Sequence, residues 1–347
     1  MTQFYDILKQ LLRVPSVVGA EHPFLIYLKR ELEELELEVE FYDGLLVAKG
    51  SNPESGYLSA HADRHGLICT GKNEFQYAAF LAKNQTNIKE QSIQADELLK
   101  NFTKRFVDEK VQAYEPYSGS YMGMGTIKET YLCERRENII FKIDGLSHIH
   151  PGTPIAFMDK LSIKEDTIYA QLDNTISVAC ILYLYQKGYQ GTAFFTASEE
   201  AGMSWIYLLD YFKKYDLSTN ELLVLDTSPY KTKEEIDLLD IVLRNRDQNG
   251  YFKSPLKQKI KRIAIERGIK YHYKDEYLKS LHNQNNPNNT KAKLGITELG
   301  RIIKASKGSV QGTTLQIPTI GYHTSNETAN KKSIKLFIEV LKKVYNL

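Results

Sequence analysis

The sequence predicts an α/β protein: a three-layer αβα domain around a mostly parallel or mixed sheet, with a small, mostly β domain inserted into it. Apolar runs of strand length alternate with amphipathic segments of helix length before residue 66 and after residue 163. Residues 66–163 lose this alternation and mix tyrosine, glycine and charged residues between short strand-like runs. We therefore expect residues 1–65 and 164–347 to form one domain and residues 66–163 to form the inserted one.

Residues 1–65 begin with two amphipathic segments and continue with three strand-like runs. Apolar residues recur at helical spacing in the first two segments, and Pro23 stands in the first turn of the second. Asp43-Gly44, between two of the runs, is a strong signal for a hairpin turn. We expect helices over residues 2–13 and 23–36, and strands over residues 38–42, 45–48 and 56–60.

The inserted segment shows short strand-like runs and one region of helical character. One or two helices are expected within residues 85–111, and strands over residues 138–143 and 152–157. A similar run at residues 167–172 leads back into the main domain. This pattern predicts a small β-rich domain, for which we expect a role in oligomerisation or in substrate access.

After residue 172 the alternation of apolar strands and amphipathic helices resumes. The expected helices are residues 176–184, 203–212, 255–267, 298–305 and 333–345. The expected strands are residues 193–197, 221–225, 236–243 and 269–273, with a further apolar run at 319–323 and an Asn-rich loop at 281–290.

The sequence is organised around Glu199 and Glu200, two adjacent carboxylates that end an apolar strand and precede Gly202. Acids side by side repel each other, so at least one of them favours a cation or a proton. One glutamate can bind a metal ion while the other handles protons on a water molecule. The alternative is a helix N-terminus, where the helix dipole favours acids.

Five strand ends carry side chains that bind metal ions in proteins: His61, Asp173, Glu200, Asp226 and His323. Such ends meet at one edge of an open α/β sheet. Imidazoles with carboxylates suit zinc, cobalt or manganese better than calcium. Five ligands exceed the needs of one open catalytic site and fit two ions, about 3.5–4 Å apart, that share one carboxylate. Taken singly, each residue is more often a satisfied polar residue, a turn residue or a helix cap.

Composition narrows the class of protein. The chain has 347 residues, 42% hydrophobic and 25% charged, which is typical of a globular protein with a sizeable core. A net charge of +2 gives no reason to expect a nucleic-acid or membrane partner, and the basic stretch 257–267 is interpreted as a solvated helix face. Three scattered cysteines suggest no disulfide framework. Because neither a signal peptide nor a membrane helix is expected, we predict a cytoplasmic protein.

The sequence resembles a known family, the co-catalytic dinuclear metallo-aminopeptidases of the tetrahedral, deblocking or glutamyl type. The resemblance covers nearly the whole chain, including an insert between the first histidine motif and the bridging aspartate. The motifs that carry it are His61-Ala-Asp63, Gly152-Thr-Pro-Ile155, Leu172-Asp173-Asn174, Glu199-Glu200-Ala-Gly202, Leu225-Asp226, Thr297-Glu298-Leu-Gly300 and Ile317-Pro-Thr-Ile-Gly-Tyr-His323-Thr324.

The resemblance implies a role for each candidate residue. His61, Asp173 and Asp226 would hold one divalent ion, and Asp173, Glu200 and His323 the other, with zinc expected and cobalt or manganese as alternatives. Glu199 would be the general base that takes a proton from the bridging water. Asp63 follows His61 on the same strand face, so we expect it to orient a ligand and count it with Glu199 among the catalytic residues. The resemblance also implies a homo-oligomer, often a closed shell that restricts the entry of peptides.

Three positions depart from the family's usual pattern. Arg64 stands where an acid is usual, Asn174 where a second aspartate is common, and Thr297-Glu-Leu-Gly300 replaces Thr-Asp-Ala-Gly. Arg64 either binds a substrate carboxylate or, as we favour, pairs with a neighbouring acid.

Other features near the insert have weaker interpretations. His65, His148 and His150 lie in or beside the insert. His148 and His150 would share one face if this stretch is a strand, and we expect a polar surface pair here rather than a further metal site. A cluster of tyrosines in the insert suits either self-association or packing against the main domain.

The sequence therefore predicts a metal-dependent aminopeptidase that acts on peptide substrates. One rival is a carboxypeptidase or deacylase with the same dinuclear site. The other is a non-catalytic scaffold that binds metal without hydrolysing any peptide.

Overall fold

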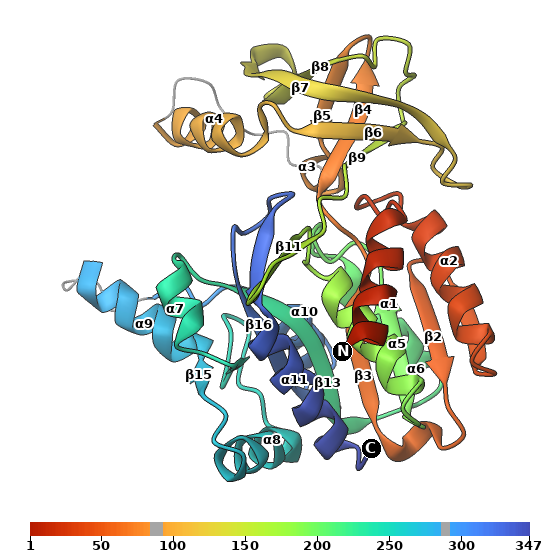
Figure 1. The fold of residues 1–347 in the computed structure, drawn as a ribbon, viewed down its shortest axis with the longest axis vertical. Helices are drawn as coiled ribbons and strands as arrows, with labels where there is room; N and C mark the ends of the chain where they lie inside the picture. Colours follow the sequence, from red (N-terminus) through yellow and green to blue (C-terminus); the bar gives the residue numbers. More distant parts are fainter. Residues whose placement is uncertain (84–92, 286–291) are drawn as a thin grey trace.

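The computed structural model describes residues 1–83, 93–285 and 292–347, and its larger part is built on an eleven-stranded mixed sheet within those residues (Figure 1). Four neighbouring strands at its centre run parallel, and the flanking strands are mostly antiparallel. The order across the sheet is β1 (Glu38–Tyr42), β2 (Leu45–Lys49), β12 (Thr192–Thr196), β3 (Tyr57–His61), β13 (Thr219–Pro229), β16 (Val310–Ile320), β17 (Glu327–Asn330), β11 (Thr167–Ala170) and β10 (Ser162–Ile163). The short strands β14 (Ile241–Leu243) and β15 (Tyr271–Tyr273) extend it beside β16.

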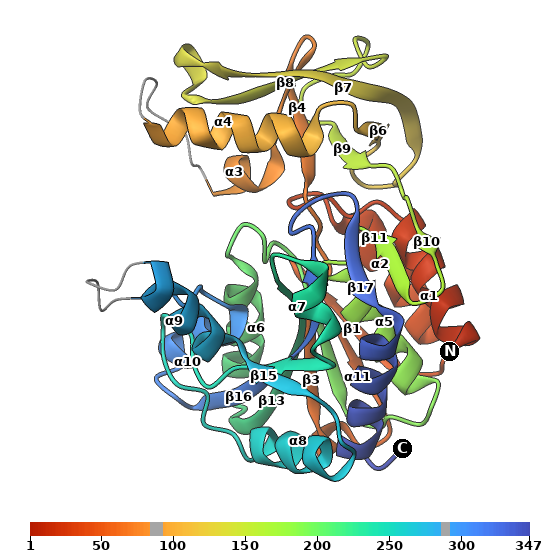
Figure 2. The same ribbon diagram turned by 60° about the vertical axis from the view of Figure 1, so that its left-hand side comes forward.

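Helices cover both faces of this sheet, which makes the three layers visible in Figure 2. One layer contains α1 (Thr2–Arg13), α2 (His22–Glu33), α5 (Thr175–Tyr185), α8 (Pro255–Glu266) and α11 (Lys331–Val344). The opposite layer contains α6 (Ser204–Lys214) and α10 (Glu298–Ala305). The short helix α7 (Lys233–Asp237) and helix α9 (Lys274–Asn285) lie near the carboxyl edge of the sheet.

The two layers follow from the alternation of side chains along the strands. In β12, Ala193 and Phe195 pack into the core shared with α1 and α5, while Phe194 packs with α6 and α10 on the other face. Both faces are apolar because both are covered, as parallel strands require. Helix α5 is buried on nearly all sides, which explains its almost uniformly apolar sequence.

The smaller part is a closed barrel with its own hydrophobic core, and it lies over the carboxyl ends of the parallel strands (Figure 1). Its strands, in order around the barrel, are β4 (Gly66–Gly71), β5 (Glu74–Tyr77), β8 (Asn138–Asp144), β7 (Tyr121–Cys133), β6 (Lys110–Tyr114) and β9 (Pro154–Phe157). Helices α3 (Ala78–Ala82) and α4 (Ile93–Phe106) pack against it. The chain passes from β3 into β4 within a few residues, so the barrel begins directly at the sheet edge.

The predicted fold class is confirmed, and so are most elements, including the hairpin at Asp43-Gly44. The strand expected over residues 236–243 is wrong for residues 236–240, which form the end of α7 and the turn after it. Thr232 and Glu235 form a reciprocal capping box there, and this local signal starts a helix. The Asn-rich loop expected over residues 281–290 is wrong for 281–285, which continue α9, while residues 286–291 lie outside the described part.

No helix within the described ranges is long and apolar enough to span a membrane. Residues 145–153 form turns and irregular chain, so His148 and His150 do not share a strand face, and both are exposed, as expected of a polar surface pair.

Candidate metal centre

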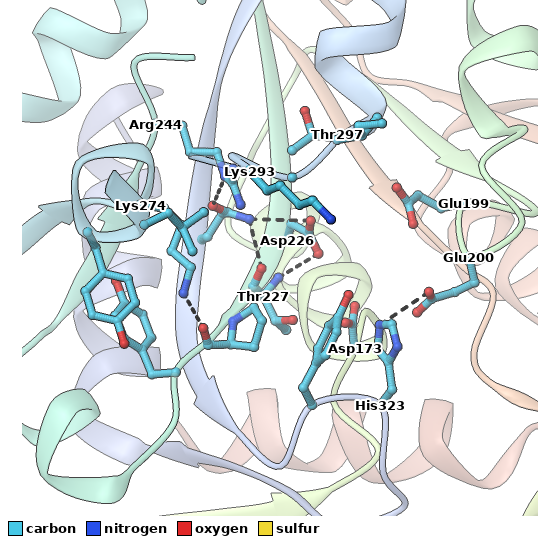
Figure 3. A pocket seen from close by; sticks show the side chains of 18 of the residues that line it. Asp173, Glu199, Glu200, Asp226, Thr227, Arg244, Lys274, Lys293, Thr297 and His323 are labelled. Carbon is cyan, nitrogen blue, oxygen red and sulfur yellow. Dashed lines mark hydrogen bonds and ion pairs between the residues drawn. The ribbon is translucent and has the colours of Figure 1, made fainter. Parts of the chain in front are cut away.

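The predicted site residues meet at the carboxyl edge of the sheet, although they come from five separate strand ends. His61 is the last residue of β3, Asp226 lies near the end of β13, and Asp173 follows β11. Glu199 and Glu200 follow β12, and His323 lies in the turn between β16 and β17. Because β11, β12, β3, β13 and β16 all point the same way, their ends bring these side chains into one cluster (Figure 3).

The first group of possible ligands consists of His61, Asp173 and Asp226. Nε2 of His61 lies 3.2 Å from Oδ1 of Asp173 and 3.7 Å from Oδ1 of Asp226. One ligand atom from each residue lies within 4.8 Å of the others. One imidazole and two carboxylates in this arrangement suit a divalent ion with N and O ligands.

The second group consists of His65, Glu200 and His323. Oε2 of Glu200 lies 2.8 Å from Nε2 of His65 and 3.4 Å from Nε2 of His323. His65, for which the sequence predicted no role in the site, is 4% exposed and joins the cluster. No sequence pattern predicts this position, because His65 lies four residues beyond the end of β3, where the direction of the chain does not follow from strand periodicity.

Asp63 fixes the backbone that carries both glutamates. Its fully buried carboxylate accepts hydrogen bonds from the amides of Glu199 and Glu200, each at 2.9 Å. The same carboxylate lies 3.4 Å from Nδ1 of His61, on the side of the ring away from Asp173. Asp63 thus aligns an imidazole and two carboxylates at once, as supporting carboxylates in metal sites do.

Glu327 does the same on the opposite side of the cluster. Its buried carboxylate accepts hydrogen bonds from the amides of Leu172 and Asp173, both at 2.8 Å, and from the amide of His323 at 3.0 Å. Sequence reasoning missed Glu327, because an acid after Thr324-Ser-Asn resembles a solvated turn residue. No local signal distinguishes it, since the amides of Leu172 and Asp173 are distant in sequence.

Burial and the neighbouring charges shift the pKa values of the clustered side chains strongly. Burial, together with the charge of Asp173, raises the pKa of Glu200 well above its usual value. Burial also raises the pKa of Glu199, and the charges of Glu200 and Asp226 add to it. Burial opposes the protonation of His61, but the surrounding carboxylates outweigh it and raise its pKa. An excess of buried negative charge of this kind is stabilised by cations.

The two histidines of the second group behave differently. Burial lowers the pKa of His65 to about 3 and holds the pKa of His323 well below its usual value. Both rings are therefore neutral at neutral pH, which is the form of histidine that binds metal ions.

Unpaired polar atoms also favour bound ions at this place. Oδ1 of Asp173, Oε1 of Glu200 and both ring nitrogens of His65 are buried without a hydrogen-bond partner. Nearby atoms lie within reach, but their orientation does not allow a hydrogen bond. Buried polar groups are nearly always satisfied, so donor atoms that converge without bonding one another fit a metal ion between them.

The three departures from the family pattern have structural explanations. The ion pair that we favoured for Arg64 is wrong: its guanidinium donates to the backbone carbonyls of Leu12 and Val14, and it forms no ion pair with an acid in the described part of the chain. Asn174 donates to the carbonyl of Leu225 at 2.9 Å, a bond that an aspartate could not make.

The longer acid at position 298 also has partners. Glu298 accepts hydrogen bonds from Ser59 at 3.0 Å and Thr196 at 2.7 Å, and these residues lie on β3 and β12 just before the site. It therefore ties helix α10 to the two strands that carry His61 and the glutamates.

A pocket of about 470 Å³ opens beside the cluster, and side chains of opposite charge line it. We call Asp173, Glu199, Glu200 and Asp226 with His61 and His323 its acidic wall, and the cationic side chains Lys231, Arg244, Lys274 and Lys293 its cationic wall. In Figure 3, Arg244 and Lys274 lie across the pocket from Glu199 and Glu200. Gln316 connects the two walls, since it donates to Asp226 at 3.5 Å and accepts from Arg244 at 3.2 Å.

Comparisons with known proteins agree with this geometry. A family model described as M42 glutamyl aminopeptidase matches residues 144–340, which is more than half of the chain. No curated protein matched the sequence.

Three solved structures from archaea are similar over nearly the whole chain. A TET aminopeptidase from a marine sediment thaumarchaeon has a TM-score of 0.71 at 15% identity, covering 99% of this chain and 96% of its own. An aminopeptidase from Desulfurococcus kamchatkensis has a TM-score of 0.69 at 15% identity, covering 100% and 95%. The TET1 peptidase of Pyrococcus horikoshii, which assembles into a tetrahedron or an octahedral shell, has a TM-score of 0.67 at 17% identity, covering 99% of both chains. At these identities the likeness establishes a shared fold.

The position of Asp63 generates a prediction about metal affinity. We expect Asp63→Asn to weaken metal binding about 10–100-fold, because an amide offers only one acceptor oxygen to the two backbone amides and turns an N–H group toward the other. Competition with a chromophoric chelator measures the affinity. The control is Asp210→Asn, which removes the same charge at an exposed site on α6. Equal affinities of both variants and the unaltered chain would contradict this role of Asp63.

Proposed function

The chain belongs to the M42 glutamyl aminopeptidase family, and from this premise we propose that it removes acidic residues from the N-termini of peptides with the help of two divalent metal ions. Membership of this family makes the chain a hydrolase of the aminopeptidase class. One observation carries the finer proposal: an acidic and histidine-rich cluster faces a cationic wall across a single pocket.

We assign the ligands by position. His61, Asp173 and Asp226 hold one ion, while Asp173, Glu200 and His323 hold the other, so that Asp173 is shared. The location of Asp173 between the other carboxylates supports this assignment (Figure 3). Zinc is the proposed ion, with cobalt or manganese as alternatives, because the donors are imidazole nitrogens and carboxylate oxygens. When bound, such ions polarise the scissile carbonyl and lower the pKa of a water molecule.

Glu199 is the proposed general base. It lines the pocket beside Glu200. Its backbone amide donates to the Asp63 carboxylate, which fixes the position of the backbone from which its side chain extends. Its carboxylate takes a proton from the attacking water and passes it to the leaving amine. Asp63 is a positioning residue in this scheme, since it holds His61 and both glutamates without facing the pocket.

The charges of the pocket favour a negatively charged substrate side chain. Four carboxylates and four cationic side chains line it. Two divalent ions would balance the four carboxylates, and no cationic side chain of the pocket forms an ion pair among the described residues, although the charges of Asp247 and Asp275 act on Arg244 and that of Glu235 acts on Lys274. An N-terminal glutamate or aspartate supplies the missing charge.

Hydrolysis of an unbiased peptide library tests the proposed activity. The protein is stripped of metal and reloaded with Zn²⁺, Co²⁺ or Mn²⁺. We expect stepwise loss of N-terminal residues, acidic ones first, only in the reloaded samples. Metal-dependent cleavage at C-termini or of acylated amines would instead indicate the carboxypeptidase or deacylase rival. Two bound ions without any cleavage would indicate the scaffold.

The matched variant in this assay is Glu199→Gln. It is expected to retain its fold and its metals but to lose turnover by about 10²–10⁴-fold, the usual contribution of a general base. Glu221→Gln, an exposed change at the other end of β13, serves as the control and keeps full activity. Near-normal turnover of Glu199→Gln would rule out the proposed base.

Lys274 is the cation whose charge responds to pH. It is buried over the ring of Tyr230, 3.8 Å from its centroid, and 4.8 Å from that of Tyr277. Burial lowers the pKa of Lys274 to about 7, with the charge of Arg244 acting in the same direction and that of Glu235 against it. Lys274 is therefore protonated below pH 7 and loses its charge as the pH rises through that value.

This pKa predicts a pH-dependent preference for acidic residues. The ratio of kcat/KM for an N-terminal Glu peptide over the matching Gln peptide is expected to be highest below pH 7 and to fall above it. The ratio cancels the titration of the α-amino group, which both peptides share. Lys274→Met should lower the ratio below pH 7 about 10–100-fold and remove its pH dependence, because a hydrogen bond to a charged group contributes about 1.5–3 kcal/mol.

The control for this experiment is Lys279→Met, which removes an exposed cation one turn further along α9. A Glu/Gln ratio that is unchanged in Lys274→Met would contradict the role of the cationic wall, while leaving the metal-dependent hydrolysis untouched.

We also propose that the barrel, within residues 66–163, is an inserted domain that takes part in homo-oligomer formation and limits access to the site. Two observations support this. The barrel side of the molecule exposes large side chains, with Tyr117 73%, Tyr121 64% and Met124 51% exposed. The similar TET1 peptidase is known to form large closed assemblies.

Light scattering of the purified chain tests the assembly. We expect particles of several copies, and association about tenfold weaker in Tyr121→Ser, because buried aromatic residues carry much of the free energy of such interfaces. Leu238→Ser, at an exposed position near the end of α7, is the control. A monomer at all concentrations would contradict the proposal.

A further inference from the structure

His65 occupies a buried position between the sheet and the barrel that the proposed ligand assignment leaves unused. It directly precedes β4, and its carbonyl accepts a hydrogen bond from Gln171 at 2.9 Å. Its ring stacks on Tyr77 of β5, with centroids 5.1 Å apart and planes 17° apart. The backbone and one face of the ring are thus held in place, so the orientation of the imidazole is fixed.

The other side of the ring faces the second group of ligands. Nε2 of His65 lies 2.8 Å from Oε2 of Glu200, closer than any other nitrogen of the cluster lies to that oxygen among the described residues. The rings of His65 and His323 are 3.8 Å apart at an angle of 56°. Two imidazoles and one carboxylate therefore converge on one point, with ligand atoms all within 4.8 Å of one another.

These atoms do not satisfy one another by hydrogen bonding. Both ring nitrogens of His65 and Oε1 of Glu200 are buried without a hydrogen-bond partner, although the distance of 2.8 Å is short enough for one. Because these atoms form no hydrogen bond with one another, the donor atoms of the ring and of the carboxylate remain free to bind a metal ion.

We propose that His65 is a ligand of the second metal ion, beside Glu200, His323 and the shared Asp173. This inference rests on the proposed two-metal function and adds a donor to it. The second ion then has two imidazole and two carboxylate ligands, whereas the first has one imidazole, from His61, and two carboxylates.

The consequence is an unequal pair of metal sites. Four protein ligands complete a tetrahedral zinc site, while three leave a position open. The second ion is therefore held more tightly, and its additional imidazole favours zinc, cobalt or nickel over manganese and magnesium. The first ion keeps the open position.

Metal titration of the full chain tests this proposal. The metal-free protein is titrated with Zn²⁺ in competition with a chromophoric chelator, and with Co²⁺ followed by its visible absorption. We expect two binding constants in the unaltered chain. In His65→Leu the tighter of the two should weaken by at least about 100-fold, which is the upper end of the cost of losing a supporting residue. His323→Leu should weaken the same constant, and His61→Leu the other.

The control is His148→Leu, which removes an exposed histidine that lies 3.3 Å from the carbonyl of Met122. Unchanged constants in His65→Leu would overturn the proposal, and two bound ions with aminopeptidase activity would still support the proposed function. If the unaltered chain bound no second ion, the proposed function would itself fail.

A second measurement does not depend on whether the variant folds. X-ray absorption at the zinc edge of the fully loaded, unaltered protein reports the imidazoles bound per ion. Three histidines shared by two ions support the proposal, and two histidines shared by two ions contradict it.

Discussion

The site depends on one buried interaction, the pair of hydrogen bonds from the amides of Glu199 and Glu200 to the carboxylate of Asp63. Strands β3 and β12 are parallel neighbours, with His61 opposite Thr196, so Asp63 arrives beside the loop that carries the two glutamates. The bonds satisfy two amides that would otherwise be buried without partners, and they force both acidic side chains into the same region as Asp63. The hydrogen bonds that fix this backbone therefore bring three carboxylates, those of Asp63, Glu199 and Glu200, close together. Buried negative charges at this density are unfavourable unless cations are present. This is the physical reason for cations at this edge of the sheet.

Glu327 repeats the arrangement at the other side, where its carboxylate holds the backbone of Asp173 and His323. The proposed ligands Asp173, Glu200 and His323 come from loops, and the backbone of each is bound by a buried carboxylate that does not itself line the pocket. A site anchored in this way is preorganised, because the side chains have fixed origins before an ion or a substrate binds. Glu298 has a similar role below the site, since it accepts hydrogen bonds from Ser59 and Thr196 and so holds β3 and β12 together.

The sequence predicted what depends on strand periodicity and strand ends. His61, Glu200 and Asp226 were found because each ends or nearly ends an apolar run, and parallel runs share an edge. His65 and Glu327 were not found, since their roles arise from the course of the chain after a strand has ended. The first half of the expected strand at 236–243 failed for a different reason: the apolar alternation around Ile236 was weaker than the capping box at Thr232. Contacts between residues far apart in the sequence could therefore not be predicted. At Ile236 the prediction followed the strand pattern, whereas the structure follows the helix-capping pattern.

The barrel is structurally continuous with the site. Gly66, the residue after His65, has no space for a side chain, since a β-carbon there would lie 2.5 Å from Val17 and 2.7 Å from the carbonyl of Ile155. The connection between sheet and barrel is thus as close as packing permits, and Tyr77 of the barrel stacks on the ring of His65. A displacement of the barrel would carry His65 away from Glu200 and His323. An ion bound by these three residues would stabilise the barrel on the sheet edge by mass action, because it binds only the arrangement in which they converge. The position of the barrel and the binding of the ion are therefore coupled, since each stabilises the other.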